Sequence, residues 1–202
     1  MKRIIPLLLV AGCGLTDDSF TLDHPRILAV RATPSHIAAG ETAHIDLLAG
    51  DASGAVFETD PDTLTADVPV LHTDAGWAIT APPGAPLANL SVSLAIDGQD
   101  WPATKQVVLG DHADNPGVTT MQVDGTDEAA LTTDAGTKPM LSAISDAADL
   151  SYAWYSSVGK LDHARDAVAT LDAASPATGM IVLVVRDGAG GVGWATLPAA
   201  VR

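Results

Sequence analysis

The chain has 202 residues and carries 25 acidic against 10 basic residues, which gives a formal net charge of −15 at pH 7. A surface this acidic repels nucleic acid, so DNA-binding and RNA-binding functions are excluded. Hydrophobic residues make up 47% of the chain, which argues against wholesale disorder, but only 4% are aromatic, so the core must use small aliphatic side chains.

The first segment of the chain has the pattern of an export signal. Lys2 and Arg3 give it a positive start, residues 4–10 are apolar, and two small residues precede Cys13. This order is typical of a signal peptide, and the apolar run is far shorter than the roughly 20 residues that a spanning helix needs. We predict that residues 1–12 are removed. The alternative is a buried strand that ends by chance in Gly-Cys.

The tetrapeptide at residues 10–13, Val-Ala-Gly-Cys, resembles the lipobox of bacterial lipoproteins. The resemblance implies cleavage between Gly12 and Cys13 and covalent attachment of diacylglycerol and acyl lipid to Cys13. Cys13 is the only cysteine, so it cannot form an intramolecular disulfide. Two or more acyl chains hold a protein durably on a membrane, and Gly14 after the cysteine resembles lipoproteins sent to the outer membrane.

The mature chain is expected to open with a tether and continue with a first β-domain. Residues 13–24 are polar and acidic and have no periodic apolar pattern, which predicts a lipidated tether. From residue 25 to residue 110, short apolar runs lie between turn-forming clusters. Residues 42–48 and 90–96 alternate apolar and polar side chains, which predicts strands with one face in a core.

A tight turn is expected at residues 97–100, Asp-Gly-Gln-Asp, ahead of a strand over residues 105–109. This places Trp101 in a loop. A tryptophan in a loop can stack on a sugar or pack on a protein. Trp101 is therefore our candidate for contact with a ligand.

A domain boundary is predicted at the irregular, turn-rich residues 110–117, and a second β-domain over residues 117–202. The continuous apolar run at residues 180–185 fits a strand buried on both faces or at the centre of a sandwich. The glycine-rich residues 186–191 predict a hairpin loop. Further strands are expected at residues 121–123, 150–155 and 192–197.

Two segments leave the choice between strand edges and helical turns open. Residues 126–148 and 161–174 are rich in Ala, Leu and Asp. In a helix, apolar side chains of the second segment would share one face. Those side chains are Leu161, Ala164, Val168 and Leu171.

The pattern predicts an all-β protein with two antiparallel β-sandwiches in tandem. Four stretches are similar to immunoglobulin-like or PKD-type modules of bacterial surface lipoproteins. They are residues 25–34, 39–42, 152–159 and 184–191. The resemblance implies that Trp154, in a Tyr-x-Trp motif, fills the core of the second sandwich. No such motif precedes Trp77 in the first domain, and neither domain has the cysteine pair of antibody modules.

No catalytic or zinc-binding motif stands out, because the six histidines are scattered and no nucleophile elbow or phosphate loop is present. One metal hypothesis concerns residues 111–116, which resemble the calcium-binding linker of cadherins with Ala113 in place of an Asn. The resemblance implies Asp111, Asp114 and Asn115 as oxygen ligands of calcium. An acidic, solvated linker is the alternative.

The location and the fold together favour a noncatalytic, lipid-anchored binding or structural module of the cell envelope. Its partner would be an envelope protein or a polysaccharide, in addition to the membrane that holds the lipid. The alternatives are an accessory domain or subunit of an envelope hydrolase, and an assembly factor that lends an edge strand to a partner.

Overall fold

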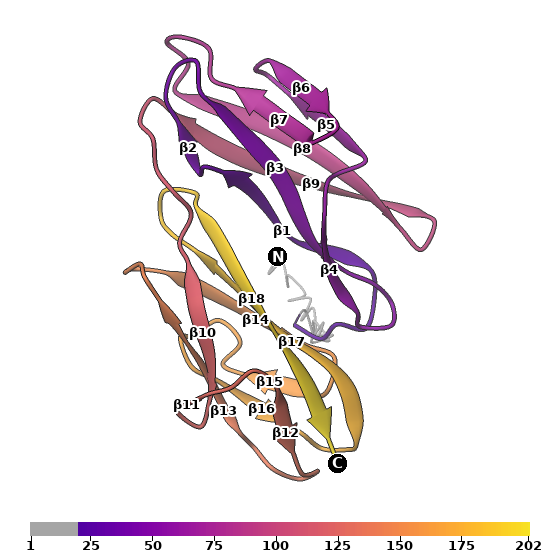
Figure 1. Cartoon of the computed structure of the whole chain (residues 1–202). Helices are drawn as coiled ribbons and strands as arrows, with labels where there is room; N and C mark the ends of the chain where they lie inside the picture. The colour runs from indigo at the N-terminus through magenta and orange to yellow at the C-terminus, as the bar shows by residue number, and fades with distance from the viewer. Residues whose placement is uncertain (1–19) are drawn as a thin grey trace, which may run out of the picture.

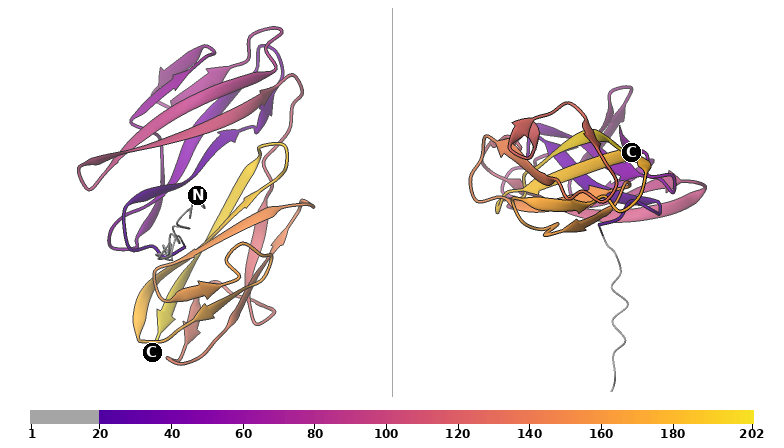
Figure 2. Two further views of the ribbon diagram at one scale, coloured as in Figure 1. Left: turned by 180° about the vertical axis from the view of Figure 1, so that it is seen from behind. Right: turned by 90° about the horizontal axis from the view of Figure 1, so that it is seen from below.

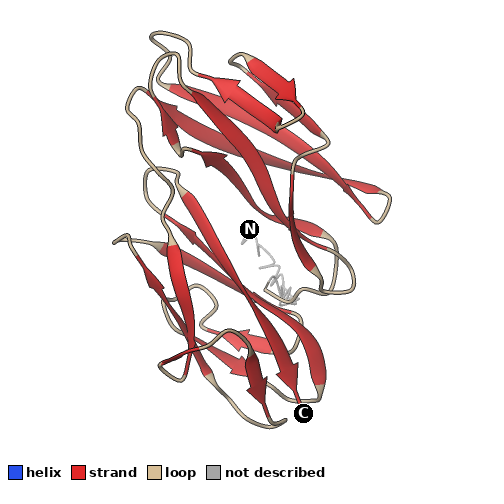
Figure 3. Ribbon diagram, viewed as in Figure 1, coloured by secondary structure: helices blue, strands red, loops and turns tan. Residues whose placement is uncertain are grey.

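The structure is a computed structural model and describes residues 20–202. The predicted signal peptide, the cleavage site after Gly12 and the lipidation of Cys13 lie outside these residues. The described chain forms eighteen strands and contains no helix (Figure 3). Consequently, no helix that could cross a membrane is found in residues 20–202.

The first sandwich pairs a sheet of order β1-β3-β7-β6, with β4 also on β3, with a sheet of order β2-β9-β8-β5 (Figure 1). The strand β2 runs parallel to β9, whereas the other pairs are antiparallel. The strands are β1 (Arg26–Thr33), β2 (His36–Ile37), β3 (Thr42–Gly50), β4 (Val56–Thr59), β5 (Thr63–Ala66), β6 (Val70–Thr73), β7 (Gly76–Thr80), β8 (Leu87–Ile96) and β9 (Gln99–Leu109).

The second sandwich repeats this topology except for one edge strand, because β11 pairs with β10, the counterpart of β1, whereas β4 pairs with β3. Its sheets have the orders β11-β10-β13-β16-β15 and β12-β18-β17-β14, and β12 is parallel to β18 as β2 is to β9. The strands are β10 (Val118–Val123), β11 (Thr126–Asp127), β12 (Leu131–Thr133), β13 (Met140–Ser145), β14 (Ser151–Ser156), β15 (Lys160–Asp162), β16 (Ala169–Asp172), β17 (Ala177–Arg186) and β18 (Val192–Val201). The fold is two immunoglobulin-like β-sandwiches in tandem, as the sequence predicts.

Apolar side chains that face inward alternate along the strands with side chains that face solvent, and the inward ones form each core. Ala43, Ile45 and Leu47 are fully buried on β3, and the apolar positions of β8 face them from the second sheet. In the second sandwich Trp154 is fully buried, and its Nε1 donates a hydrogen bond of 3.0 Å to the carbonyl of Asp166. The core position that the resemblance implied for Trp154 is therefore correct.

The position expected for Trp101 is wrong. The turn consists of Asp97 and Gly98 alone, with φ of 53° and 77°, and β9 starts at the next residue. Two consecutive residues with positive φ make a two-residue hairpin whose twist matches its strands. Trp101 therefore lies within β9 opposite Leu94, and its half-buried ring packs against the first core.

The two ambiguous segments form strands and not helices. Residues 126–148 contain β11 to β13, and residues 161–174 contain most of β15 and β16. His163, at φ 60°, lies in the left-handed region, which interrupts a right-handed helix. Antiparallel pairing of β16 with β13 and β15 then satisfies the backbone and overrides the helical tendency of alanine and leucine.

Candidate functional site: the seam between the sandwiches

The two sandwiches meet along an apolar seam. The outer face of β1 and β3 packs on the outer face of β14, β17 and β18 (Figures 1 and 2). Leu28 and Leu48 on one side contact a cluster that includes Val182 and Val184 on the other, and both valines are 0% exposed. The strand β17 is thus buried on both faces, as its continuous apolar sequence predicts.

Residues 20–22 are built into the same seam. Phe20 and Leu22 join the apolar cluster, and Leu22 is only 3% exposed. The amide of Leu22 donates to the carbonyl of Ser156 at 2.8 Å, and the amide of Ser156 donates to the carbonyl of Phe20 at 3.0 Å. These residues extend β14 as a short parallel bridge, so the end of the expected tether at residues 13–24 is docked.

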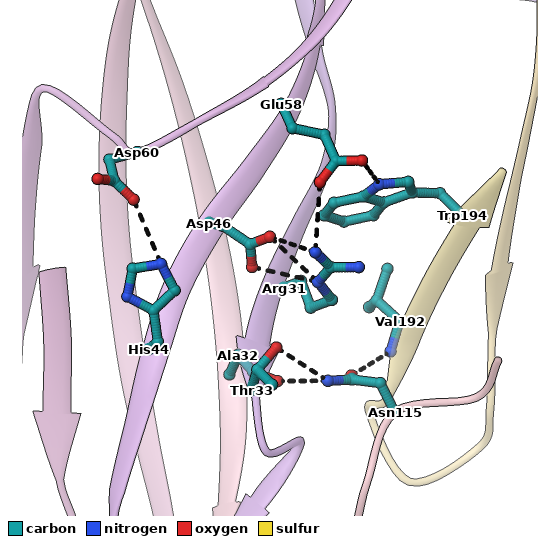
Figure 4. A network of polar contacts seen from close by, with 10 residues as sticks. All are labelled: Arg31, Ala32, Thr33, His44, Asp46, Glu58, Asp60, Asn115, Val192 and Trp194. Carbon is teal, nitrogen blue, oxygen red and sulfur yellow. Dashed lines mark hydrogen bonds and ion pairs between the residues drawn. The ribbon is translucent and has the colours of Figure 1, made fainter. Parts of the chain in front are cut away.

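A polar contact beside the apolar seam joins the sandwiches (Figure 4). The guanidinium carbon of Arg31 lies 3.7 Å from the ring centroid of Trp194 on β18, a cation–π contact. Asp46 accepts two hydrogen bonds from Nε of Arg31, at 3.1 and 3.2 Å. Glu58 lies 3.5 Å from Arg31 and accepts a hydrogen bond of 2.8 Å from Nε1 of Trp194. The two carboxylates hold the arginine against the indole.

The linker is fastened to both sandwiches by Asn115. Its Nδ2 donates to the carbonyl of Ala32 at 2.7 Å, and its Oδ1 accepts from the amide of Val192 at 2.9 Å (Figure 4). The hydroxyl of Ser35 also bonds to the linker carbonyls of Ala113 and Asp114, both at 2.9 Å. These bonds satisfy the backbone where the chain passes from one domain to the next.

The structure places the three residues that the cadherin-like motif suggested for calcium in different surroundings. Asn115 links the sandwiches, while Asp111 and Asp114 are exposed, and Asp114 lies 3.7 Å from His112. Over residues 20–202, no group of three or more His, Cys, Asp or Glu side chains is placed to hold a metal ion.

A cleft of about 700 Å³ opens at the end of the seam, and both sandwiches line it. The first sandwich contributes β1 and the facing parts of β8 and β9, and the second contributes the loop between β17 and β18. The lining residues of polar or charged type are Asn89, Ser91, Thr104, Lys105, Gln106, Arg186 and Asp187. Of those on β8 and β9, Lys105 takes the inward phase and the other four take the outward phase.

The environment of the cleft changes the pKa of Lys105. Its Nζ donates to the carbonyl of Gly190 at 2.6 Å, across the domain boundary. The pKa of Lys105 is lowered from 10.5 to about 8, mainly by burial and also by the positive charge of Arg186, while Asp187 acts in the opposite direction. The cleft therefore holds an ammonium group that loses its proton more readily than an exposed lysine.

Sequence reasoning missed both cations of the cleft. A signal for Lys105 is present, because it takes the inward phase of β9 between Ala103 and Val107. A lysine at an inward position is a local exception to the pattern and marks a functional or structural site. No comparable signal marks Arg186, whose position follows from how the second sandwich docks on the first.

No protein-family model matches the sequence, and no curated protein matches it. Solved structures with a similar fold include the Ig1-2 module of the Drosophila receptor protein tyrosine phosphatase DLAR, with 13% identity, coverage of 89% of this chain and 99% of that chain, and a TM-score of 0.37. A C-terminal fragment of intimin, in complex with the intimin-binding domain of its translocated receptor, has 12% identity, coverage of 87% and 64%, and a TM-score of 0.34. These values are too low to assign a function or a partner.

Proposed function

We propose that the protein is a lipid-anchored, noncatalytic binding module of the cell envelope, in which two fused sandwiches present one ligand cleft. The observation that carries the proposal is the cleft itself, because its walls come from both domains. The apolar seam, the contact of Arg31 with Trp194 and the bonds of Asn115 fix those walls relative to one another. A preorganised cleft loses little entropy when it binds a ligand.

The lipobox-like sequence supports the anchor. Seven residue steps separate Cys13 from Phe20, the first residue in the seam, so this stretch reaches at most about 25 Å. A lipid on Cys13 would therefore hold both sandwiches near the membrane as one body. The substitution Cys13→Ser should prevent incorporation of labelled palmitate and should release the protein from the membrane fraction. Unchanged incorporation of labelled palmitate in the variant would contradict the anchor.

The binding role is tested by site-specific photocrosslinking in native cells. A long photoreactive side chain at Gln106, a residue that lines the cleft, should give a discrete adduct with an envelope component. The same amino acid at Thr63, an exposed residue outside the cleft, is the matched control. Equal labelling at both positions, or none at Gln106, would argue against a ligand in the cleft.

A further inference from the structure

The two cations of the cleft bond to backbone carbonyls, and neither forms an ion pair with a carboxylate of the described chain. Nζ of Lys105 donates to Gly190, and Nη2 of Arg186 donates to the carbonyl of Leu28 at 3.1 Å. The two cations lie close enough that the charge of Arg186 disfavours the protonated form of Lys105. An ammonium group has three donors and a guanidinium group has five. Both cations therefore keep donors for an anionic ligand.

Asp187 is the acid that lines the cleft, and its own loop holds the carboxylate. Its Oδ1 accepts the amides of Ala189 and Gly191, at 2.9 and 2.7 Å. No other acid lines the cleft, so two cations face one carboxylate there. The cleft is thus a positive site on a chain whose formal net charge is −15.

An apolar wall lies on the same side of the sheet as Lys105. Leu90 on β8 is the cross-strand partner of Lys105, so the two side chains share one face. Ala103 lies two residues before Lys105 on β9 and takes the same phase. Ile27 adds to the wall from β1 in the facing sheet, and Ile27 and Ala103 are only half-buried. The ammonium group and accessible aliphatic surface therefore border the same space.

We infer that the cleft binds a small aliphatic carboxylate, with its charged group between Lys105 and Arg186 and its hydrocarbon chain on the apolar wall. This inference rests on the proposed binding function and names its ligand class. Hydrogen bonds between a cation and a carboxylate are roughly twice as strong as neutral ones, and burial of methylene groups adds to the affinity. The cleft of about 700 Å³ has the size of ordinary ligand pockets, roughly 300–1,000 Å³.

The test is isothermal titration at pH 7 of the full-length lipidated protein in nanodiscs of zwitterionic lipid, with empty nanodiscs as the reference. The probes are hexanoate, hexanamide, which has the same chain and no charge, and acetate, which has the same charge and a shorter chain. We expect hexanoate to bind at least about tenfold more tightly than either. Equal binding of hexanamide would overturn the role of the cations, and equal binding of acetate would overturn the apolar wall. Absence of hexanoate binding would overturn the whole inference.

Two substitutions should move the affinity for hexanoate in opposite directions. Lys105→Met removes a cation and should weaken binding about tenfold. Asp187→Asn removes the lining acid but keeps an oxygen for the loop amides, so binding should strengthen severalfold. A gain of affinity cannot come from misfolding. Lys138→Met is the control, because Lys138 pairs with Asp172 outside the cleft. An unchanged affinity in both cleft variants would contradict the site.

Proton uptake on binding provides a readout specific to Lys105. The charged groups that face Lys105 in the cleft are Arg186 and Asp187. Since the pKa of Lys105 is about 8, about half of these ammonium groups have lost their proton at pH 8. A bound carboxylate favours the protonated form, so hexanoate should draw in up to about half a proton per ligand at pH 8. Titrations in buffers of different ionisation enthalpy measure this uptake, and Lys105→Met should abolish it. Zero uptake by the unaltered protein would overturn the placement of the carboxylate at Lys105.

Photocrosslinking at Gln106 separates failure of this inference from failure of the proposed function. If hexanoate fails to bind while Gln106 still gives its specific adduct, the ligand class is wrong and the binding function stands. Loss of both results would remove both proposals.

Discussion

Lys105 holds its ammonium group half-buried beside Arg186, so the folded protein disfavours the protonated form. The folded pKa, about 8, is below the unfolded value near 10.5, and the unfolded chain therefore binds more protons between these two values. Stability should rise with pH across that window, and the cost of burying the charge is fully present below pH 8. A lysine that gains an ion-pair partner on folding usually has a raised pKa, and its contribution to stability then falls as the pH rises. Lys105 shows the reverse.

The substitution Lys105→Met should relieve this cost. We expect the midpoint of thermal unfolding at pH 7 to rise by about 2–6 °C, which corresponds to roughly 1–3 kcal/mol for a chain of this size. The increase in stability from pH 8 to pH 10 should disappear in scans at several pH values. Lys138→Met, at an exposed lysine, should keep that increase. A lower midpoint in Lys105→Met would show that the bond to Gly190 outweighs the buried charge.

At the scale of elements, residues 20–22 act as a short added strand on β14 and as part of the apolar seam. Leu22 is 3% exposed, so Leu22→Ala should remove about 2–4 kcal/mol of stability through the lost burial and the space it leaves. It should also loosen the bonds between this segment and Ser156. Hydrogen exchange at the Ser156 amide measures that effect directly.

Thr21→Ala is the matched control, because its side chain is only half-buried and the backbone bonds of its neighbours remain. Protection of the Ser156 amide should stay close to that of the unaltered protein. If Leu22→Ala leaves both the stability and this protection intact, then residues 20–22 lie on the seam without stabilising it.

At the scale of the whole molecule, the seam makes two sandwiches behave as one body. Val184 is fully buried and points away from its own core, so Val184→Glu should open the seam while both cores persist. Burying an unpaired carboxylate there costs several kcal/mol. We expect a larger radius of gyration in small-angle scattering and separate unfolding transitions in calorimetry.

Ile144→Glu provides the comparison on the second sandwich. Ile144 lies on β13, the counterpart of β3, and is 46% exposed. Its substitution should change neither the radius of gyration nor the number of transitions. A compact, single-transition Val184→Glu protein would mean that the polar contacts of Arg31 and Asn115 suffice to join the domains.

The sequence by itself determined the class of fold and much of the local structure. The alternation of apolar and polar residues in β3 and β8 predicted which side chains face the core. The Asp97-Gly98 pair predicted a hairpin, but its turn is two residues long and not four, so Trp101 lies in a strand and not in a loop. These features depend on neighbours within a few residues, so a local pattern contains them. The apolar run of β17 indicated a strand buried on both faces or at the centre of a sandwich, but it did not show which element covers the second face.

Only the tertiary structure decided the seam and the cleft. The contact of Arg31 with Trp194, the approach of Lys105 to Gly190 and the docking of Leu22 join residues that are far apart in the sequence. Tertiary pairing likewise turned the alanine-rich segments into strands β13 and β16. Such contacts depend on how one complete sandwich packs on another, and no periodicity within either domain encodes that choice.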